Sequence, residues 1–215
     1  MFVSRSFETK TGLLKNVKCI DGDLTPFIIM DDWNAHYDLI MSYVRSNNTV
    51  IQAGGNCGLY ARLYATVFDS VFTFEPDPIN FSCLAENCKL NRIVKFNTAL
   101  ANKNGMLNMN LISTENFGMT KVVDVKENVG YSSYGITVDS LTIPNVSLIH
   151  LDIEGYEYEA LLGAKKTIEK WKPTIVLEMT EKQDQIYNFM EKISYKEQEV
   201  FSHNGQTKNS LFVSK

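Results

Sequence analysis

The sequence lacks several features that mark other large classes of protein. It has no block of lysine or arginine and a formal net charge of −4, so electrostatic capture of nucleic acid is not expected. It has no apolar run long enough to span a bilayer and no N-terminal signal peptide, which predicts a cytoplasmic protein without membrane insertion. Its four cysteines form no C-x-x-C pair, which favours reduced thiols over zinc ligands or disulfides.

Two common nucleotide-binding motifs are also missing from the glycine-rich segment 50–58. Counted from Gly54, the dinucleotide fingerprint needs glycines where Asn56 and Leu59 stand, and no Gly-Lys-Ser/Thr of a P-loop follows. An apolar strand that runs into a glycine turn without a pyrophosphate cradle suits S-adenosylmethionine, which carries a ribose and an amino-acid tail but no pyrophosphate. An ordinary strand-to-helix turn is the alternative interpretation.

A carboxylate follows this turn at the spacing of a ribose ligand. Glu75 ends the apolar segment 71–75, 21 residues after Gly54. A carboxylate about 20 residues after such a turn can accept hydrogen bonds from ribose hydroxyls. Together the turn and the carboxylate predict a site for a nucleoside-type cofactor.

Apolar strand patterns alternate with helical ones, which predicts an α/β fold with a doubly wound, mostly parallel sheet and an antiparallel edge strand. Strands are expected near 49–53, 71–75, 94–98, 146–152, 174–178, 195–201 and 210–214, and helices near 33–46, 57–67, 78–88, 157–168 and 186–193. Ligands bind beyond the carboxyl ends of parallel strands in such sheets. This rule brings four strand-end residues to one cleft: Gly54, Glu75, Asp152 and Glu178.

The chain divides into an N-terminal extension, residues 1–48, and a cofactor-binding domain, residues 49–215. Turn signals at 21–23 predict a hairpin within 12–30, and Asp31 and Asp32 are suited to cap the helix that follows. Residues 136–141 are expected to form a short extended piece.

The polar, glycine-dotted segment 113–135 has no clear secondary structure. Its aromatic side chains, Phe117, Tyr131 and Tyr134, lie among glycines and form either a lid over a bound substrate or ordinary loop anchors.

A second group of titratable residues crowds the end of the strand at 146–152. His150 and Asp152 point to the same face of a strand, and Glu154 and Glu157 follow after a sharp turn at Gly155. Carboxylates that repel one another in a cleft are typical of functional sites. The alternative is that the two glutamates only cap the next helix, whose N-terminus favours negative charge.

The motifs together resemble a known family. Five segments occur in order, namely 54–58, 74–76, 137–141, 152–157 and 173–178. They resemble the FkbM-type S-adenosylmethionine-dependent methyltransferases over about residues 49 to 180, and Asp-x-Glu-Gly-x-Glu is the most specific element. The resemblance implies a class I methyltransferase fold and methylation of a hydroxyl on a sugar, glycan or small metabolite.

The resemblance also implies roles for individual residues. The cofactor-binding set is Gln52, Gly54, Gly55, Asn56, Gly58, Glu75, Pro76, Ala99 and Asp152, in which Glu75 takes the ribose hydroxyls and Asn97-Thr98-Ala99 lies against adenine. The catalytic candidates are His150, Asp152 and Glu154. The acceptor-binding candidates are Tyr131, Tyr134, Glu157 and Glu178. Two positions depart from the family: Gln52 stands where an acidic residue is usual, and His150 where lysine is frequent.

A general base is needed because an alcohol is a poor nucleophile until its proton is removed. No metal is expected: Asp152 and Glu154 offer oxygen ligands for magnesium, but two carboxylates rarely complete a site. Two other functions stay open. One is a nicotinamide-dependent oxidoreductase, which the glycine spacing disfavours, and the other is a non-catalytic scaffold that retains the cofactor cleft. The residue pattern does not indicate an oligomeric state.

Overall fold

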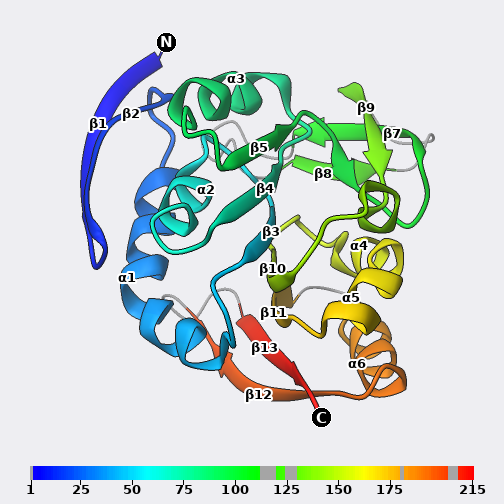
Figure 1. The fold of residues 1–215 in the computed structure, drawn as a ribbon. Coiled ribbons are helices and arrows are strands. Elements are labelled where there is room, and N and C mark those ends of the chain that lie inside the picture. Colours follow the sequence, from blue (N-terminus) through cyan, green and yellow to red (C-terminus); the bar gives the residue numbers. More distant parts are fainter. Residues whose placement is uncertain (1, 112–119, 124–129, 180–181, 203–207) are drawn as a thin grey trace.

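The computed structural model describes residues 2–111, 120–123, 130–179, 182–202 and 208–215, with a seven-stranded sheet at its centre (Figure 1). The sheet order is β12-β13-β11-β10-β3-β4-β5. These strands are β3 (Thr49–Ala53), β4 (Ser70–Phe74), β5 (Ile93–Phe96), β10 (Val146–Leu151), β11 (Thr174–Met179), β12 (Tyr195–Phe201) and β13 (Lys208–Ser214). The neighbouring strands β11, β10, β3, β4 and β5 all run parallel, and β13 runs antiparallel to both β11 and β12. The predicted mostly parallel sheet with antiparallel pairing at its edge is confirmed, and the antiparallel strand lies one place in from the edge.

Helices cover both faces of this sheet, because its central strands are buried on both sides. The helices are α1 (Thr25–Tyr43), α2 (Leu59–Tyr64), α3 (Pro78–Asn87), α4 (Glu157–Gly163), α5 (Lys165–Trp171) and α6 (Gln183–Lys192). Successive strand side chains point to opposite faces. Val50 and Leu148 accordingly pack into the core cluster under α1–α3, and Ile51 and Ile149 pack into the cluster under α4–α6.

The N-terminal segment differs from expectation in detail. A hairpin forms, but from β1 (Phe2–Thr9) and β2 (Gly12–Ile20), so the predicted hairpin around 21–23 is wrong, although residues 21 and 22 do form a turn. There the chain enters α1, because the Asp23 carboxylate accepts the backbone N–H of Thr25 at 3.1 Å and Pro26 suits the first helical turn. Asp31 and Asp32 lie inside α1 and do not cap it.

The hairpin packs on the main domain beside α3. The backbone N–H of Lys18 donates to Asn87 Oδ1, and Asn87 Nδ2 donates to the Lys18 carbonyl, both at 2.7 Å. The division of the chain at residue 48 stays a prediction.

A second, four-stranded sheet lies beside the end of the main sheet (Figure 1). Its strands are β6 (Ala99–Leu100), β7 (Gly105–Leu111), β8 (Thr120–Val123) and β9 (Tyr131–Ile136), in the order β6-β9-β7-β8. Two strands thus arise in the segment to which the sequence assigns no structure. The predicted extended piece at 136–141 is wrong from residue 138, where the 3₁₀ turn η1 (Val138–Leu141) begins. Phe117 of the predicted lid lies outside the described residues.

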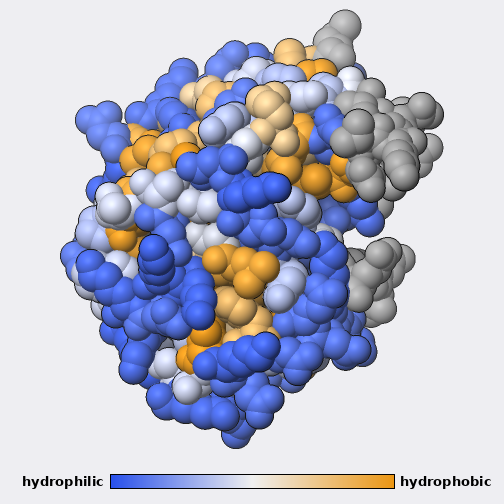
Figure 2. All heavy atoms as spheres, turned by 90° about the vertical axis from the view of Figure 1, so that its right-hand side faces the viewer, coloured by the Kyte–Doolittle hydropathy of each residue, from blue (hydrophilic) through white to orange (hydrophobic). Residues whose placement is uncertain are grey.

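The predicted helix at 157–168 is two helices that meet at Ala164. Gly163, just before the break, lies so close to the second sheet that a Cβ there would come within 1.9 Å of the Ala101 carbonyl oxygen. Figure 2 shows that the face with α4, α5 and the second sheet is mainly hydrophilic, with apolar side chains in small separate patches. All four cysteines are free and buried. Within the described ranges, no helix has the length and apolar character needed to cross a membrane.

Candidate functional site

The glycine turn after β3 is shaped by its packing on neighbouring elements. Gly54 has φ +82°, and a Cβ there would come within 1.9 Å of the Asp152 carbonyl oxygen. A Cβ on Gly55 would meet Leu84 of α3 at 2.6 Å, and a Cβ on Gly58 would meet Cys88 at the same distance. The glycines therefore let the turn press against the end of β10 and against α3. Close approach to a ligand is not needed to explain them.

Gln52 stabilises this turn from within. Its side chain, 1% exposed, donates from Nε2 to the Gly54 carbonyl at 2.9 Å and accepts from the Thr73 hydroxyl at 2.6 Å. Both ends of the amide are thus engaged with the protein. Gln52 does not line the cavity described below, and its predicted contact with a cofactor stays a prediction.

Glu75 joins the glycine turn to the start of α3. Its Oε2 accepts the backbone N–H of Asn56 at 2.7 Å, and its Oε1 accepts the backbone N–H of Asp77 at 2.8 Å. Burial raises the pKa of Glu75 to about 7, although both hydrogen bonds favour the charged form. A carboxyl group placed in this way is held rigidly and titrates near neutral pH.

A cavity opens beyond the carboxyl ends of β3, β4 and β10. Its empty volume is about 470 Å³, counting the part open to solvent. The lining residues that the sequence predicted are Gly54, Glu75, Pro76, Ala99, Asp152 and Glu154, with Thr98 from the expected adenine-contacting piece. The lining residues that it missed are Ala53, Phe74, Leu100, Met109, Thr120, Val122, Ile153 and Tyr156. Three of these, Met109, Thr120 and Val122, come from the second sheet. The sequence predicts an extended segment at 106–112 but not its place beside the cavity.

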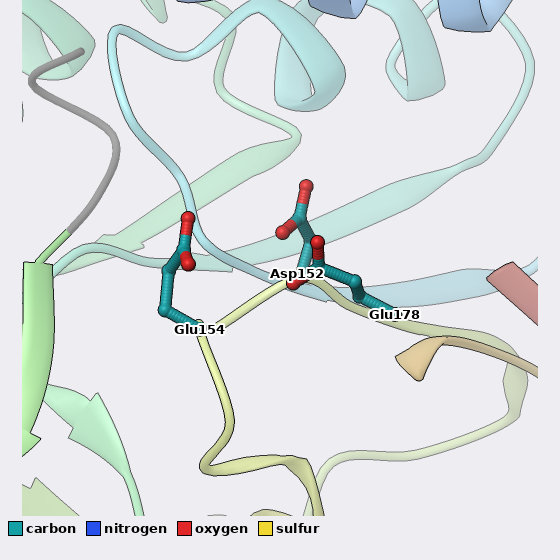
Figure 3. Close-up of side chains that lie close together, drawn as sticks. All are labelled: Asp152, Glu154 and Glu178. Atoms are coloured by element: carbon teal, nitrogen blue, oxygen red, sulfur yellow. The ribbon is translucent and has the colours of Figure 1, made fainter. Parts of the chain in front are cut away.

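Three carboxyl groups meet at one edge of this cavity (Figure 3). Asp152 and Glu154 follow β10, Glu178 belongs to β11, and one oxygen from each lies within 4.8 Å of the others. Burial is the main cause of their raised pKa values, and mutual repulsion adds to it. The pKa is about 7 for Glu154 and for Glu178 and well above the usual range for Asp152, which hydrogen-bonds Glu178.

Glu157 has a local structural role. It is buried, and its Oε1 accepts the backbone N–H groups of Ile153, at 2.9 Å, and Gly155, at 3.3 Å. Its carboxylate therefore holds the turn between β10 and α4. Its predicted contact with an acceptor stays a prediction.

The other predicted acceptor residues do not line the cavity. Tyr131 and Tyr134 lie on β9, and Tyr134 is 48% exposed. Glu178 lies beside the carboxyl groups of Asp152 and Glu154 but is not itself among the residues that line the cavity. Tyr156, between these carboxyl groups and α4, is the tyrosine that does line the cavity.

His150 lies on the side of the sheet that α2 covers. It is 3% exposed, and its Nδ1 pairs with the Tyr64 hydroxyl at 2.8 Å. Burial lowers the pKa of His150 to about 4, so the ring is neutral at physiological pH. His150 is not among the cavity-lining residues. The structure therefore supplies no contact that supports its predicted role as a base.

A buried polar group of α1 lies near His150, and the sequence did not indicate it. Asp32 accepts the Tyr60 hydroxyl at 2.7 Å and pairs with His36 Nδ1 at 2.9 Å. Tyr60 in turn packs edge-on against His150, with 4.7 Å between ring centroids. This network ties α1 to α2 behind the cavity.

Comparison with known proteins assigns the fold and the family. The sequence-family model of the methyltransferase FkbM domain matches residues 60–198, well over half of the chain. The chain belongs to the FkbM methyltransferase family. The sequence-based resemblance is thereby confirmed. None of the curated proteins is similar enough in sequence to count as a match.

Solved structures agree with this assignment. A methyltransferase FkbM from Methylobacillus flagellatus KT superposes with TM-score 0.58 and 16% identity over 91% of this chain and 55% of that one. A putative methyltransferase from Streptococcus mutans, in complex with SAH, gives 0.52 and 9% over 84% and 96%. A ribosomal protein L11 methylase from Lactobacillus delbrueckii gives 0.52 and 11% over 86% and 79%. At these identities the likeness shows the fold alone, and this FkbM chain spans just over half the length of the first of these proteins.

Proposed function

We propose that this FkbM chain is an S-adenosylmethionine-dependent O-methyltransferase acting on a hydroxyl of a sugar, glycan or small metabolite. One observation carries the proposal: a single cavity at the carboxyl ends of the central strands is lined by Glu75, the predicted ribose ligand, and by Asp152 and Glu154. A cofactor anchor and proton-accepting groups thus share one space. The other two interpretations, a nicotinamide-dependent oxidoreductase and a scaffold, are outcomes of the experiment below.

The residues present fit the cofactor. Each oxygen of Glu75 accepts one backbone N–H, and a carboxylate oxygen has a second lone pair that remains for a ribose hydroxyl. Thr98, also on the cavity wall, has a buried Oγ1 without a hydrogen-bond partner in the described part of the chain. Adenine nitrogens are suitable partners for this hydroxyl. Bound here, S-adenosylmethionine would supply an activated sulfonium methyl group.

Glu154 is the base that the geometry favours. It lines the cavity and its pKa is about 7, so it can accept a proton from an acceptor hydroxyl near neutral pH. The Asp152 carboxyl group is hydrogen-bonded to Glu178, and His150 is bonded to Tyr64 on the α2 side. We therefore assign the proton transfer to Glu154 in place of His150.

The remaining wall suits alignment of a small polar acceptor. Phe74, Leu100, Met109, Val122 and Ile153 give the cavity a partly apolar lining. The Tyr156 ring offers a flat surface, and aromatic rings stack well on sugar faces. Holding the acceptor oxygen in line with the methyl group is the main task of an enzyme whose donor is already activated.

The test measures binding and transfer separately. S-adenosylhomocysteine binding is followed by calorimetry, and transfer of a labelled methyl group is assayed on sugars, glycans and small hydroxylated metabolites. Glu154→Gln is expected to lower kcat by roughly 10²–10⁴ without changing S-adenosylhomocysteine affinity. Glu169→Gln on α5, an exposed glutamate paired with Lys165, is the matched control with no expected effect.

Each other outcome favours a different function. Binding of NAD instead of S-adenosylhomocysteine would indicate the oxidoreductase. Cofactor binding without transfer to any acceptor would indicate the scaffold, and transfer to RNA alone would overturn the predicted absence of a nucleic-acid partner. The cytoplasmic location stays a prediction.

A further inference from the structure

Asp152, Glu154 and Glu178, here called the carboxylate cluster, have the spacing of a cation site. The three side chains come from the loop after β10 and from β11, and one oxygen of each lies within 4.8 Å of the others. Oxygen ligands lie 2.0–2.1 Å from Mg²⁺ and 2.3–2.6 Å from Ca²⁺, so two ligands of one ion are at most about 4–5 Å apart. The cluster therefore fits around one ion with little or no movement.

A second observation points to a missing partner at the same place. Glu178 is only 9% exposed, and its Oε2 is sealed from solvent with no hydrogen-bond partner among the residues that the structure describes. Its carboxyl group is directed toward Asp152 (Figure 3). A buried carboxylate oxygen without a partner is costly, and a bound cation would satisfy it.

The charges around the cluster lead to the same conclusion. The positive charge of Lys121 on β8 acts on both Glu154 and Glu178. One positive charge balances only one of three carboxylates, and like charges this close disfavour joint ionisation. A divalent ion would balance the charges that remain.

We propose that the carboxylate cluster binds one hard divalent cation of the Mg²⁺, Mn²⁺ or Ca²⁺ class. The proposal revises the expectation of a metal-free site, which considered only two carboxylates: tertiary structure adds a third, Glu178. Such ions bind with oxygen ligands and keep several waters, so an acceptor hydroxyl can replace one water at the edge of the cavity. This role rests on the proposed function, because it places the ion beside the acceptor, where it would lower the pKa of the hydroxyl. Glu154 would then bind the ion through one oxygen and accept the hydroxyl proton on the other.

The experiment is a titration of the purified full-length chain with Mn²⁺, in which electron paramagnetic resonance measures the free ion. One saturable site per chain is expected. Glu178→Gln and Glu154→Gln should each weaken binding by about tenfold or more, the usual effect of losing one charge-assisted contact. Glu169→Gln on α5 should leave it unchanged. Mg²⁺ and Ca²⁺ are then tested as competitors.

Two results would overturn the proposal: no saturable Mn²⁺ binding below about 1 mM, the weak limit of protein calcium sites, or equal binding by all three variants and the unmodified chain. Thermal melts establish whether Glu178→Gln is folded. If that variant does not fold, the Mn²⁺ affinity of Glu154→Gln, a less buried position, tests the proposal instead. S-adenosylhomocysteine calorimetry in EDTA separates the two proposals. Methyl transfer that persists in EDTA removes only the proposed role of the cation in transfer, and Mn²⁺ binding without cofactor binding removes only the methyltransferase.

Discussion

The carbonyl oxygen of Asp152 occupies the space in which a side chain on Gly54 would begin, since a Cβ there would lie 1.9 Å from it. The backbone N–H of Asp152 also donates to the Ala53 carbonyl at 3.2 Å. The glycine turn and the exit of β10 are therefore packed directly together. This contact sets the distance between the cofactor side of the cavity and its carboxylate side.

Replacement of Gly54 by alanine should be far more damaging than the left-handed backbone alone explains. Gly22 provides the control, because it has a similar φ of +84° but open space around the Cβ position. Gly22→Ala is expected to cost about 1–2 kcal/mol, and Gly54→Ala at least about twice that, because backbone must move. Urea denaturation measures both free energies of unfolding. Equal losses of unfolding free energy in the two variants would show that the Asp152 backbone moves away from residue 54 at little cost.

Glu75→Ala should weaken S-adenosylhomocysteine binding by about tenfold or more, since hydrogen bonds to a charged group contribute roughly 1.5–3 kcal/mol. Asp77→Ala is the matched control. The Asp77 carboxylate accepts the N–H groups of Ile79 and Asn80 at the start of α3, so its loss should cost about 1 kcal/mol of stability. Calorimetry should find cofactor affinity unchanged in that variant. Unaltered affinity in Glu75→Ala would contradict the predicted ribose contact.

His150 should make stability depend on pH. Its folded pKa of about 4 lies below its usual value of 6.5, so between these values the unfolded chain binds more protons. The stabilisation is complete above about pH 6.5 and is lost as pH falls toward about 4, a change of up to roughly 3 kcal/mol.

His150→Gln tests this sign. The carboxyl group of Glu75, with its raised pKa, acts in the opposite direction between its usual 4.5 and about 7, so only a difference between proteins is informative. The stability advantage of the unmodified chain over His150→Gln should be larger at about pH 7.5 than at about pH 4.5. Chemical denaturation at both pH values measures it, and a constant difference would contradict burial of the neutral ring.

Asp32→Ala should destabilise the protein by about 2–3 kcal/mol, because it leaves the buried Tyr60 hydroxyl without its acceptor. Asp38→Ala on the same helix is the control. Asp38 is largely exposed and pairs with Lys10, so its loss should cost about 1 kcal/mol or less. Thermal melting distinguishes the two, and similar values would show that the network behind the cavity contributes little.

Local sequence patterns were informative where burial is strong. The segments expected at 49–53 and 146–152 match β3 and β10 to within a residue, because strands buried on both faces are nearly continuous apolar runs. The hairpin was misplaced because its prediction depended on a turn signal and not on a buried apolar run. Asp21-Gly22-Asp23 is a turn signal, but such a signal does not reveal whether a strand or a helix follows.

The candidate site, too, could be predicted from the sequence only in part. Gly54, Glu75 and Asp152 could be assigned to one cleft from the order of residues, because the carboxyl ends of parallel strands meet at one edge. The same rule placed Glu178 in this cleft, but its direct contact with Asp152, the wall from β7 and β8, and the burial of His150 beside Tyr64 required the folded structure. These contacts join side chains that are distant along the chain, and local patterns carry no information about how such side chains pack.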